Sequence, residues 1–390
     1  MPKRSRGLAT AVAVLVLGSA LSGCGMFSGG PAKLAKPTPV TAADQRVKLS
    51  TAWQARLYGG WRVDPYQATQ VAVAGDRIVV GDSRGNVIAL NGAGRELWRR
   101  QLDGRISAGG TIAGDRVYVG NDAGFVTALS LSQGQVLWRS ALSSEVITRV
   151  VPAGDRLLAQ TNDGKLWSLS AKDGAQQWSY SATIPSLSLR GAATPLADQD
   201  TVYAAFSSGE LAALDARDGH LLWQVPVATP RGRTELERLV DADATPVLMG
   251  DSIIAGTYQG KLGAFNRSSG AESWSRDMSV FNPLLLANDR LYLTDAQDVL
   301  YAIDPRTGAT LWRNDQIQGR GVTGPALVQG TLLVGDRAGY LFAFDPESGR
   351  RIGQARIAAT GLQSAPVAFG DGALALSREG SLYRLRVARR

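Results

Sequence analysis

The sequence contains few of the side chains on which most enzyme sites depend. Cys24 is its only cysteine and His220 its only histidine. A single cysteine excludes an intramolecular disulfide, and one residue of each type leaves no set of ligands for zinc and no Cys-His or Ser-His-Asp machinery. His220 follows a turn glycine, where other copies of the repeat described below have Arg95, Gln135 or Ala175. We therefore expect His220 to be exposed and catalytically inert.

Concentrated charge and phosphate-binding loops are also missing. The formal net charge is +8, but Lys3, Arg4 and Arg6 lie in a signal segment whose removal leaves about +5. The other basic residues are scattered, so the sequence shows no nucleic-acid footprint. No G-x-x-x-x-G-K-[ST] motif is present. Asp-Gly pairs such as Asp163-Gly164 are typical of hairpin turns and do not indicate calcium loops.

What the sequence does contain is a repeat. The stretch Gly114–Trp138 reads GDRVYVGNDAGFVTALSLSQGQVLW, and similar stretches occupy Gly75–Trp98 and Gly154–Trp178. Each copy has a Gly-Asp turn, a short apolar run, a second turn, another apolar run, and a Gly four residues before a Trp. The closing tryptophans are separated by 40, 40, 45, 51 and 38 residues. The second-turn position can be followed through eight copies.

A period near forty with three or four strand signals in each unit is typical of a β-propeller. Short runs such as RIVVG and NVIAL suit half-buried antiparallel strands. The eighth copy, Phe369–Val387, has only three strand signals. A stretch near the N-terminus, Ser50–Ala55, resembles the closing strands of the other copies. The sequence therefore predicts an all-β, eight-bladed β-propeller that an N-terminal strand closes.

The region before the repeats has the composition of an export signal followed by a linker. A basic start and the apolar run Leu8–Ala20 precede Leu-Ser-Gly-Cys at residues 21–24. This motif resembles the lipobox of bacterial lipoproteins, which implies that Cys24 is lipidated and begins the mature chain. Gly25 follows it, which in that resemblance implies the outer membrane and a periplasmic location. The alternative is an ordinary cleaved signal with an incidental cysteine. We expect a signal peptide at residues 1–23, a lipidated flexible tether at 24–49 and the propeller at 50–390.

The repeated tryptophans could form a ligand-stacking cage, but a residue copied into every blade is more simply explained by packing between blades. The Gly-x-x-x-Trp ending resembles the repeats of the quinoprotein alcohol dehydrogenases. That family binds a calcium-held quinone and usually has a vicinal cysteine pair. A chain with one cysteine lacks the pair, and it is short for that family. We expect no cofactor and no metal, and a quinone-dependent enzyme is kept as the alternative function.

Two neighbouring connections between repeats are longer than most; a third long one, Trp53 to Gly75 at 22 residues, lies across the ring. From the closing Trp to the next Gly-Asp position the common lengths are 14, 16 and 17 residues, whereas Trp178 to Gln199 is 21 and Trp223 to Gly250 is 27. One enters the fourth blade and the other leaves it. Connections between blades all lie on the same face of a propeller, so we expect these two to form a single patch. Because loops on a rigid scaffold concentrate binding residues, this patch is the candidate partner site.

The lipobox, the eight repeats and these two connections together resemble the BamB family, the propeller lipoproteins of the outer-membrane β-barrel assembly machinery. The most specific matches are Leu-Ser-Leu-Arg-Gly at Leu187–Gly191 and Thr-Glu-x-x-Arg-Leu-x-Asp-x-Asp-x-Thr-Pro at Thr234–Pro246. The resemblance implies a non-enzymatic scaffold that binds the POTRA region of BamA, and through it the rest of the BAM complex, and helps deliver unfolded outer-membrane proteins. The partner-binding residues carried over are Leu187, Leu189, Arg190, Asp241 and Asp243. A scaffold of another envelope complex is a further alternative.

Overall fold

The computed structural model describes residues 36–42, 44–57, 71–185, 193–229, 234, 240–362 and 364–390. The chain divides into two units, and all of these residues belong to the second, Leu34–Arg390. They form 32 strands and no helix. Cys24 and the predicted signal peptide lie outside the described residues.

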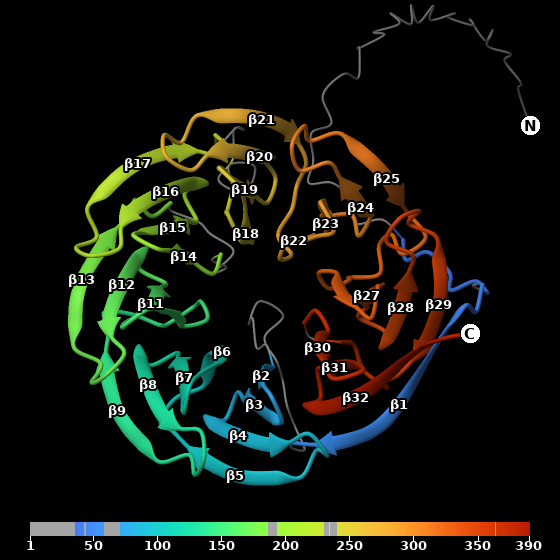
Figure 1. The fold of residues 1–390 in the computed structure, drawn as a ribbon, viewed down its shortest axis with the longest axis horizontal. Helices are drawn as coiled ribbons and strands as arrows, with labels where there is room; N and C mark the ends of the chain where they lie inside the picture. Colours follow the sequence, from blue (N-terminus) through green and yellow to red (C-terminus); the bar gives the residue numbers. More distant parts are fainter. Residues whose placement is uncertain are drawn as a thin grey trace, which may run out of the picture. The chain divides into compact units, whose positions relative to one another are not determined.

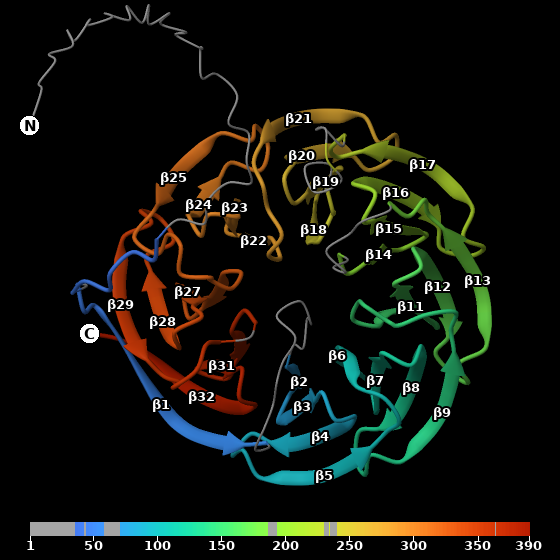
Figure 2. The same cartoon turned by 180° about the vertical axis from the view of Figure 1, so that it is seen from behind.

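The strands form eight four-stranded antiparallel sheets, which Figures 1 and 2 show arranged as the blades of a ring. The predicted eight-bladed propeller is therefore confirmed. Blades 1 to 4 consist of β2 (Ala72–Ala74), β3 (Arg77–Gly81), β4 (Asn86–Asn91) and β5 (Glu96–Gln101); β6 (Ile106–Ala113), β7 (Arg116–Asn121), β8 (Phe125–Ser130) and β9 (Val136–Ala141); β10 (Val151–Ala153), β11 (Arg156–Thr161), β12 (Lys165–Ser170) and β13 (Gln176–Ser181); and β14 (Leu196–Asp198), β15 (Thr201–Ala205), β16 (Glu210–Asp215) and β17 (Leu221–Pro226).

The remaining blades follow the same order. Blades 5 to 8 consist of β18 (Ala244–Met249), β19 (Ser252–Gly256), β20 (Lys261–Asn266) and β21 (Glu272–Asp277); β22 (Leu285–Ala287), β23 (Arg290–Thr294), β24 (Leu300–Ile303) and β25 (Thr310–Asn314); β26 (Ala326–Val328), β27 (Thr331–Gly335), β28 (Tyr340–Phe344) and β29 (Arg351–Arg356); and β30 (Val367–Phe369), β31 (Gly372–Leu376) and β32 (Ser381–Arg389) with β1 (Val47–Arg56).

The core lies between adjacent blades. One cluster, for example, joins Val79 and Trp98 of blade 1 to Val117 and Val119 of blade 2. The expectation of half-buried strands is wrong for the two middle strands of most blades. In β3, Ile78 and its two following valines are all 0% exposed. A sheet that packs against a neighbouring sheet on each side buries both of its faces, so its middle strands are buried on both sides, polar residues such as Thr127 and Ser168 included.

The N-terminal strand closes the ring, as the sequence predicts. β1 pairs antiparallel with β32, from Val47 opposite Arg389 to Arg56 opposite Ser381, in a sheet of order β1-β32-β31-β30. The predicted start of the propeller at Ser50 is three residues late, because Val47 and Leu49 are buried in the core of this junction at 1% and 8% exposure. Blade 8 therefore has no unpaired edge at β32.

The recurring tryptophans join each blade to the next, which confirms their packing role. Each indole N–H donates to a backbone carbonyl of the following blade, at 2.8–3.3 Å, in the pairs Trp53–Gly92, Trp98–Leu131, Trp138–Ala171, Trp178–Ala216, Trp223–Arg267, Trp274–Pro305 and Trp312–Pro346. Blade 7 has Gly353 at this position. Blade 8, which follows it, lacks the usual third turn because its third and fourth strands, β32 and β1, come from opposite ends of the sequence. A Cβ on Gly353 would lie 2.5 Å from the carbonyl oxygen of Val47, so a tryptophan has no room.

The two faces of the ring differ in what they carry. Because the strands of a blade are antiparallel and follow chain order, successive turns alternate between faces. One face has the turns between second and third strands, such as 336–339, together with the connections between blades, such as 315–325. We call it the connection face. The opposite face has the first and third turns of each blade.

Candidate partner-binding site

The two long connections flank blade 4 on the connection face. The first, residues 182–195, joins β13 to β14, and the second, residues 227–243, joins β17 to β18. Leu187, Leu189 and Arg190 lie outside the described residues, so their predicted roles stay predictions. Asp241 and Asp243 are described.

The described ends of these two connections are hydrogen-bonded to each other. Ala193 N–H donates to the Ala242 carbonyl at 3.2 Å, and Thr194 N–H donates to Oγ1 of Thr245, at the start of β18, at 3.4 Å. The expected meeting of the two connections is therefore confirmed for their C-terminal ends. Both enter their next blades side by side.

The segment around Asp241 is also fixed to turns of blades 4 and 5. Ala242 N–H donates to the Phe206 carbonyl at 3.4 Å, and Tyr258 N–H donates to the Asp241 carbonyl at 2.8 Å. Phe206 and Tyr258 occupy equivalent second turns in neighbouring blades. The backbone around the two aspartates is thus hydrogen-bonded to both blade 4 and blade 5.

The two aspartates occupy a largely desolvated position. Asp241 is 0% exposed, and Ala242 beside it is also 0% exposed. Asp243 is half-buried as a residue, but its Oδ1 is buried and has no hydrogen-bond partner in the described part of the chain. Burial, and secondly the nearby Asp241, raise the pKa of Asp243 to about 8. A carboxyl group in this setting is stabilised by any cation or donor brought to it.

This burial changes the expectation for Asp241. A side chain with no exposed area does not reach a partner unless the connections rearrange. The burial of Asp241 therefore argues against a direct charged contact, and the residue is linked to blade 5 through its backbone, from the Tyr258 N–H to the Asp241 carbonyl. Asp243, which retains some exposure, is better placed to contact a partner.

The connection face also presents apolar side chains that the sequence analysis did not select. Ile184, in the first long connection, is 47% exposed, and Phe281, in the connection from β21 to β22, is 37% exposed. Phe281 lies edge-on to Tyr258 with ring centroids 6.3 Å apart. Phe281 belongs to a connection of ordinary length, so loop length could not have indicated it. Phe281 thus lies next to the aspartate segment, because the Tyr258 N–H donates to the Asp241 carbonyl, whereas Ile184 lies beside Gly164 in a turn of blade 3. Exposed apolar side chains of this kind suit a protein partner.

Other chemistry finds little support in the described residues. His220 is exposed in a turn, where its backbone N–H donates to Asp218 Oδ1 at 2.9 Å. Within the ranges given above, no three histidine, cysteine or acidic residues lie close enough together to ligate a metal ion. The described chain likewise has no helix with the length and hydropathy needed to span a bilayer.

Comparisons with known proteins agree on one family. A family model described as "Outer membrane protein assembly factor BamB" matches residues 40–110 and 83–314. The outer membrane protein assembly factor BamB of Legionella pneumophila (strain Paris) is 37% identical over 381 residues, which cover 97% of this chain and 99% of that protein. The crystal structure of BamB from Moraxella catarrhalis superposes with a TM-score of 0.79 at 26% identity, covering 87% of this chain and 100% of that one.

A quinoprotein enzyme shares the architecture but not the sequence. A quinohemoprotein alcohol dehydrogenase from Pseudomonas putida HK5 has a TM-score of 0.69, covering 88% of this chain and 76% of its own, with only 12% identity. That likeness shows the fold alone. The family model and relatives 33–37% identical over most of the chain are assembly factors, and the chain belongs to the BamB family of outer membrane protein assembly factors, which are non-enzymatic scaffolds.

Proposed function

We propose that this protein is a lipid-anchored scaffold of the outer membrane protein assembly machinery. In this proposal Cys24 carries the lipid, the ring faces the periplasm, and the two long connections bind the POTRA region of BamA. The ring thereby joins the BAM complex and assists the insertion of β-barrel proteins. Family membership supports the assembly role. The lipobox motif supports the anchor.

The observation that carries the partner site is the hydrogen-bonded meeting of the two long connections around Asp241 and Asp243. The described ends of segments that are unnecessary to the repeat are here hydrogen-bonded to each other and to turns of the blades. They carry Asp243, a partly exposed residue whose carboxyl pKa is raised by burial. Leu187, Leu189 and Arg190 lie in the first connection, within ten residues of Ala193, where the two connections meet. An arginine in that connection is a natural cationic neighbour for the aspartates.

Binding of the isolated BamA periplasmic region to the purified protein tests the site. The triple variant Leu187→Ala, Leu189→Ala, Arg190→Ala should bind far more weakly, with Arg190→Ala alone costing roughly 2 kcal/mol, about a thirtyfold weakening. Blade 4 offers a matched control, Leu221→Ala, Leu222→Ala, Arg217→Ala. This control removes the same residue types from exposed positions on the outer strand and on a turn of the opposite face. Full-strength capture by the first variant contradicts the proposed patch.

The role of Asp241 requires a separate measurement. A double-mutant cycle between Arg190→Ala and Asp241→Ala should show coupling in the unfolding free energy of the isolated protein, because a fully buried carboxylate acts within the loop pair. Coupling that appears only in the free energy of BamA binding assigns the two residues to direct recognition instead.

A further inference from the structure

A short segment before the first strand is docked on the outside of blade 7. Thr38 begins it: its backbone N–H and its Oγ1 both donate to the Gln318 carbonyl at 3.0 Å. Arg320 Nη1 donates to the Thr38 carbonyl at 2.8 Å. Arg320 is itself held by a buried ion pair with Asp336, at 2.6 Å. The site for Thr38 is thus built from groups that the ring keeps in place. We call residues 38–42 the strap.

The other end of the strap satisfies a buried cation. Arg351 Nη2 donates to Thr41 Oγ1 at 2.7 Å and to the Thr41 carbonyl at 3.1 Å, and Gln354 Nε2 donates to the same carbonyl at 2.9 Å. Arg351 is only 6% exposed, and no carboxylate of the described chain lies within ion-pair distance of it. Burial, and secondly Arg320, lower the pKa of its guanidinium. The strap therefore supplies acceptors that this buried charge needs.

The strap sequence is suited to an extended, docked conformation. Pro37 and Pro39 flank Thr38, and a proline restricts both its own φ and the conformation of the residue before it. Less backbone freedom is then lost on docking. Val40 is partly buried and packs against the core cluster between blades 6 and 7, which contains Phe342 and Phe344. Thr38 and Val40 are the half-buried residues of the strap, while the residues between and around them are exposed.

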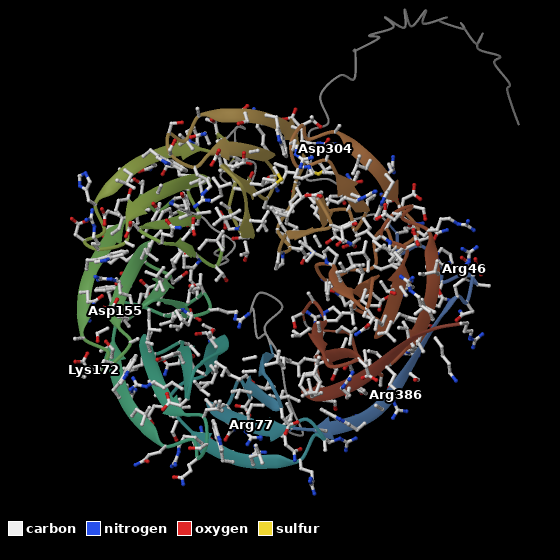
Figure 3. All side chains as sticks on the ribbon, viewed as in Figure 1. Arg46, Arg77, Asp155, Lys172, Asp304 and Arg386 are labelled. Carbon is white, nitrogen blue, oxygen red and sulfur yellow. The ribbon has the colours of Figure 1, made fainter. Side chains whose placement is uncertain are left out.

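Docking changes the face on which the N-terminal part of the chain leaves the ring. β1 starts at Val47, opposite Arg389 at the far end of β32, on the face opposite the connection face. Arg46 lies at the outer edge of the ring beside β1 (Figure 3). From there the strap runs along the outside of β29 to Gln318, which belongs to the connection between β25 and β26. The chain thus crosses from one face to the other before it reaches Thr38.

We propose that the strap attaches the N-terminal part of the chain to the ring at a second point, in addition to β1. The lipid-anchored chain then leaves the ring at the connection face. The proposal rests on the proposed lipidation of Cys24. With the strap docked, the chain from Cys24 to Lys36 spans at most roughly 40 Å, whereas the chain from Cys24 to Val47 spans up to roughly 80 Å and starts from the opposite face. The strap therefore keeps the face with the two long connections near the membrane, where a membrane-held partner meets it at a high effective concentration.

Distances between spin labels test this in the lipidated full-length chain. Labels at Lys36→Cys and Ala359→Cys report on the connection face of blade 7, and labels at Lys36→Cys and Ser348→Cys report on the opposite face. Both reference positions are exposed. We expect narrow distributions for both pairs, with Lys36 closer to position 359. The strap variant Thr38→Gly, Val40→Gly, which alters no ring residue, should broaden both distributions and remove the preference for the connection face.

Two comparisons separate the possible failures. Arg350→Met is the matched control for Arg351→Met, because within the described residues the exposed Arg350 side chain forms an ion pair with Asp44 alone, at 4.0 Å. Arg350→Met should leave the distance distributions narrow, while Arg351→Met broadens them. A broad Lys36 distribution in the unaltered chain, or no change in the strap variant, overturns the proposal. The same distance measurement on an unlipidated Cys24→Ser chain shows whether the strap is docked, independently of the lipid anchor. Failure of lipidation alone therefore leaves this result intact and appears instead in the mass of the N-terminus.

Discussion

Replacement of Gly134 by alanine tests whether the tryptophan joints hold the blades together. Gly134 lies in the third turn of blade 2 with φ of 65°. A Cβ there would overlap the six-membered ring of Trp98, whose indole N–H donates to the Leu131 carbonyl at 2.8 Å. Gly154 provides the matched control. Its φ is 64°, and a Cβ added to it meets no atom within 4 Å.

The two substitutions share one cost and differ in another. A left-handed alanine costs roughly 1–2 kcal/mol, partly offset by the reduced freedom of the unfolded chain. Gly134→Ala adds an overpacking cost of roughly 1–3 kcal/mol. Displacement of the indole adds about 1 kcal/mol for its hydrogen bond. We therefore expect Gly134→Ala to lower the free energy of unfolding by about 3 kcal/mol more than Gly154→Ala.

Urea unfolding, followed by far-UV circular dichroism and by tryptophan fluorescence, measures this difference. The Trp98→Leu background supplies a further check, because a smaller side chain leaves room for the added methyl group. In that background the extra cost of Gly134→Ala should fall close to zero. Equal destabilisation by the two alanine substitutions, or an unchanged cost in the Trp98→Leu background, refutes the view that a glycine is needed at position 134 because Trp98 packs against it.

Three further predictions concern the closing strand, the buried carboxyl group and the anchor. Deletion of residues 25–35 should leave the melting temperature unchanged, whereas deletion of residues 25–57 removes β1 and should lower it or cause aggregation; equal melting temperatures contradict closure by β1. The pKa of Asp243 is raised to about 8, so its neutral form is favoured in the folded state and its ionisation opposes folding as pH rises from about 4 to about 8. Asp243→Asn should therefore match the parent in free energy of unfolding near pH 3.5 and exceed it by about 1–3 kcal/mol at pH 8, and a pH-independent difference in that free energy rejects this assignment. Cys24→Ser should yield a chain without lipid, and mass spectrometry that finds an unmodified N-terminus in the parent rules out the anchor.

Much of the fold could be predicted because the same packing contacts recur in every blade of a propeller, and the residues that make them recur in the sequence. Each closing tryptophan, such as Trp98, meets a turn glycine of the next copy, here Gly134, so the joint recurs in the sequence at the period of the blade. The missing strand of the eighth copy could be found for the same reason, since Trp53 completes the series. The meeting of the two long connections also followed from strand order alone, because loops that flank one blade leave it on the same face.

The sequence by itself therefore determined the architecture, the closing strand and the meeting of the two long connections beside blade 4; the partner patch stays a prediction. Only the tertiary structure decided what depends on contacts between distant segments with no repeating pattern. Gly353 replaces a tryptophan because Val47, over 300 residues away in sequence, occupies its space. Asp241 lies in a polar, charged stretch that reads as exposed, yet packing against the turns of two blades buries it completely. The strap could not be distinguished from a free linker, because its docking depends on Gln318 and Arg351, which reach it only once the ring has closed.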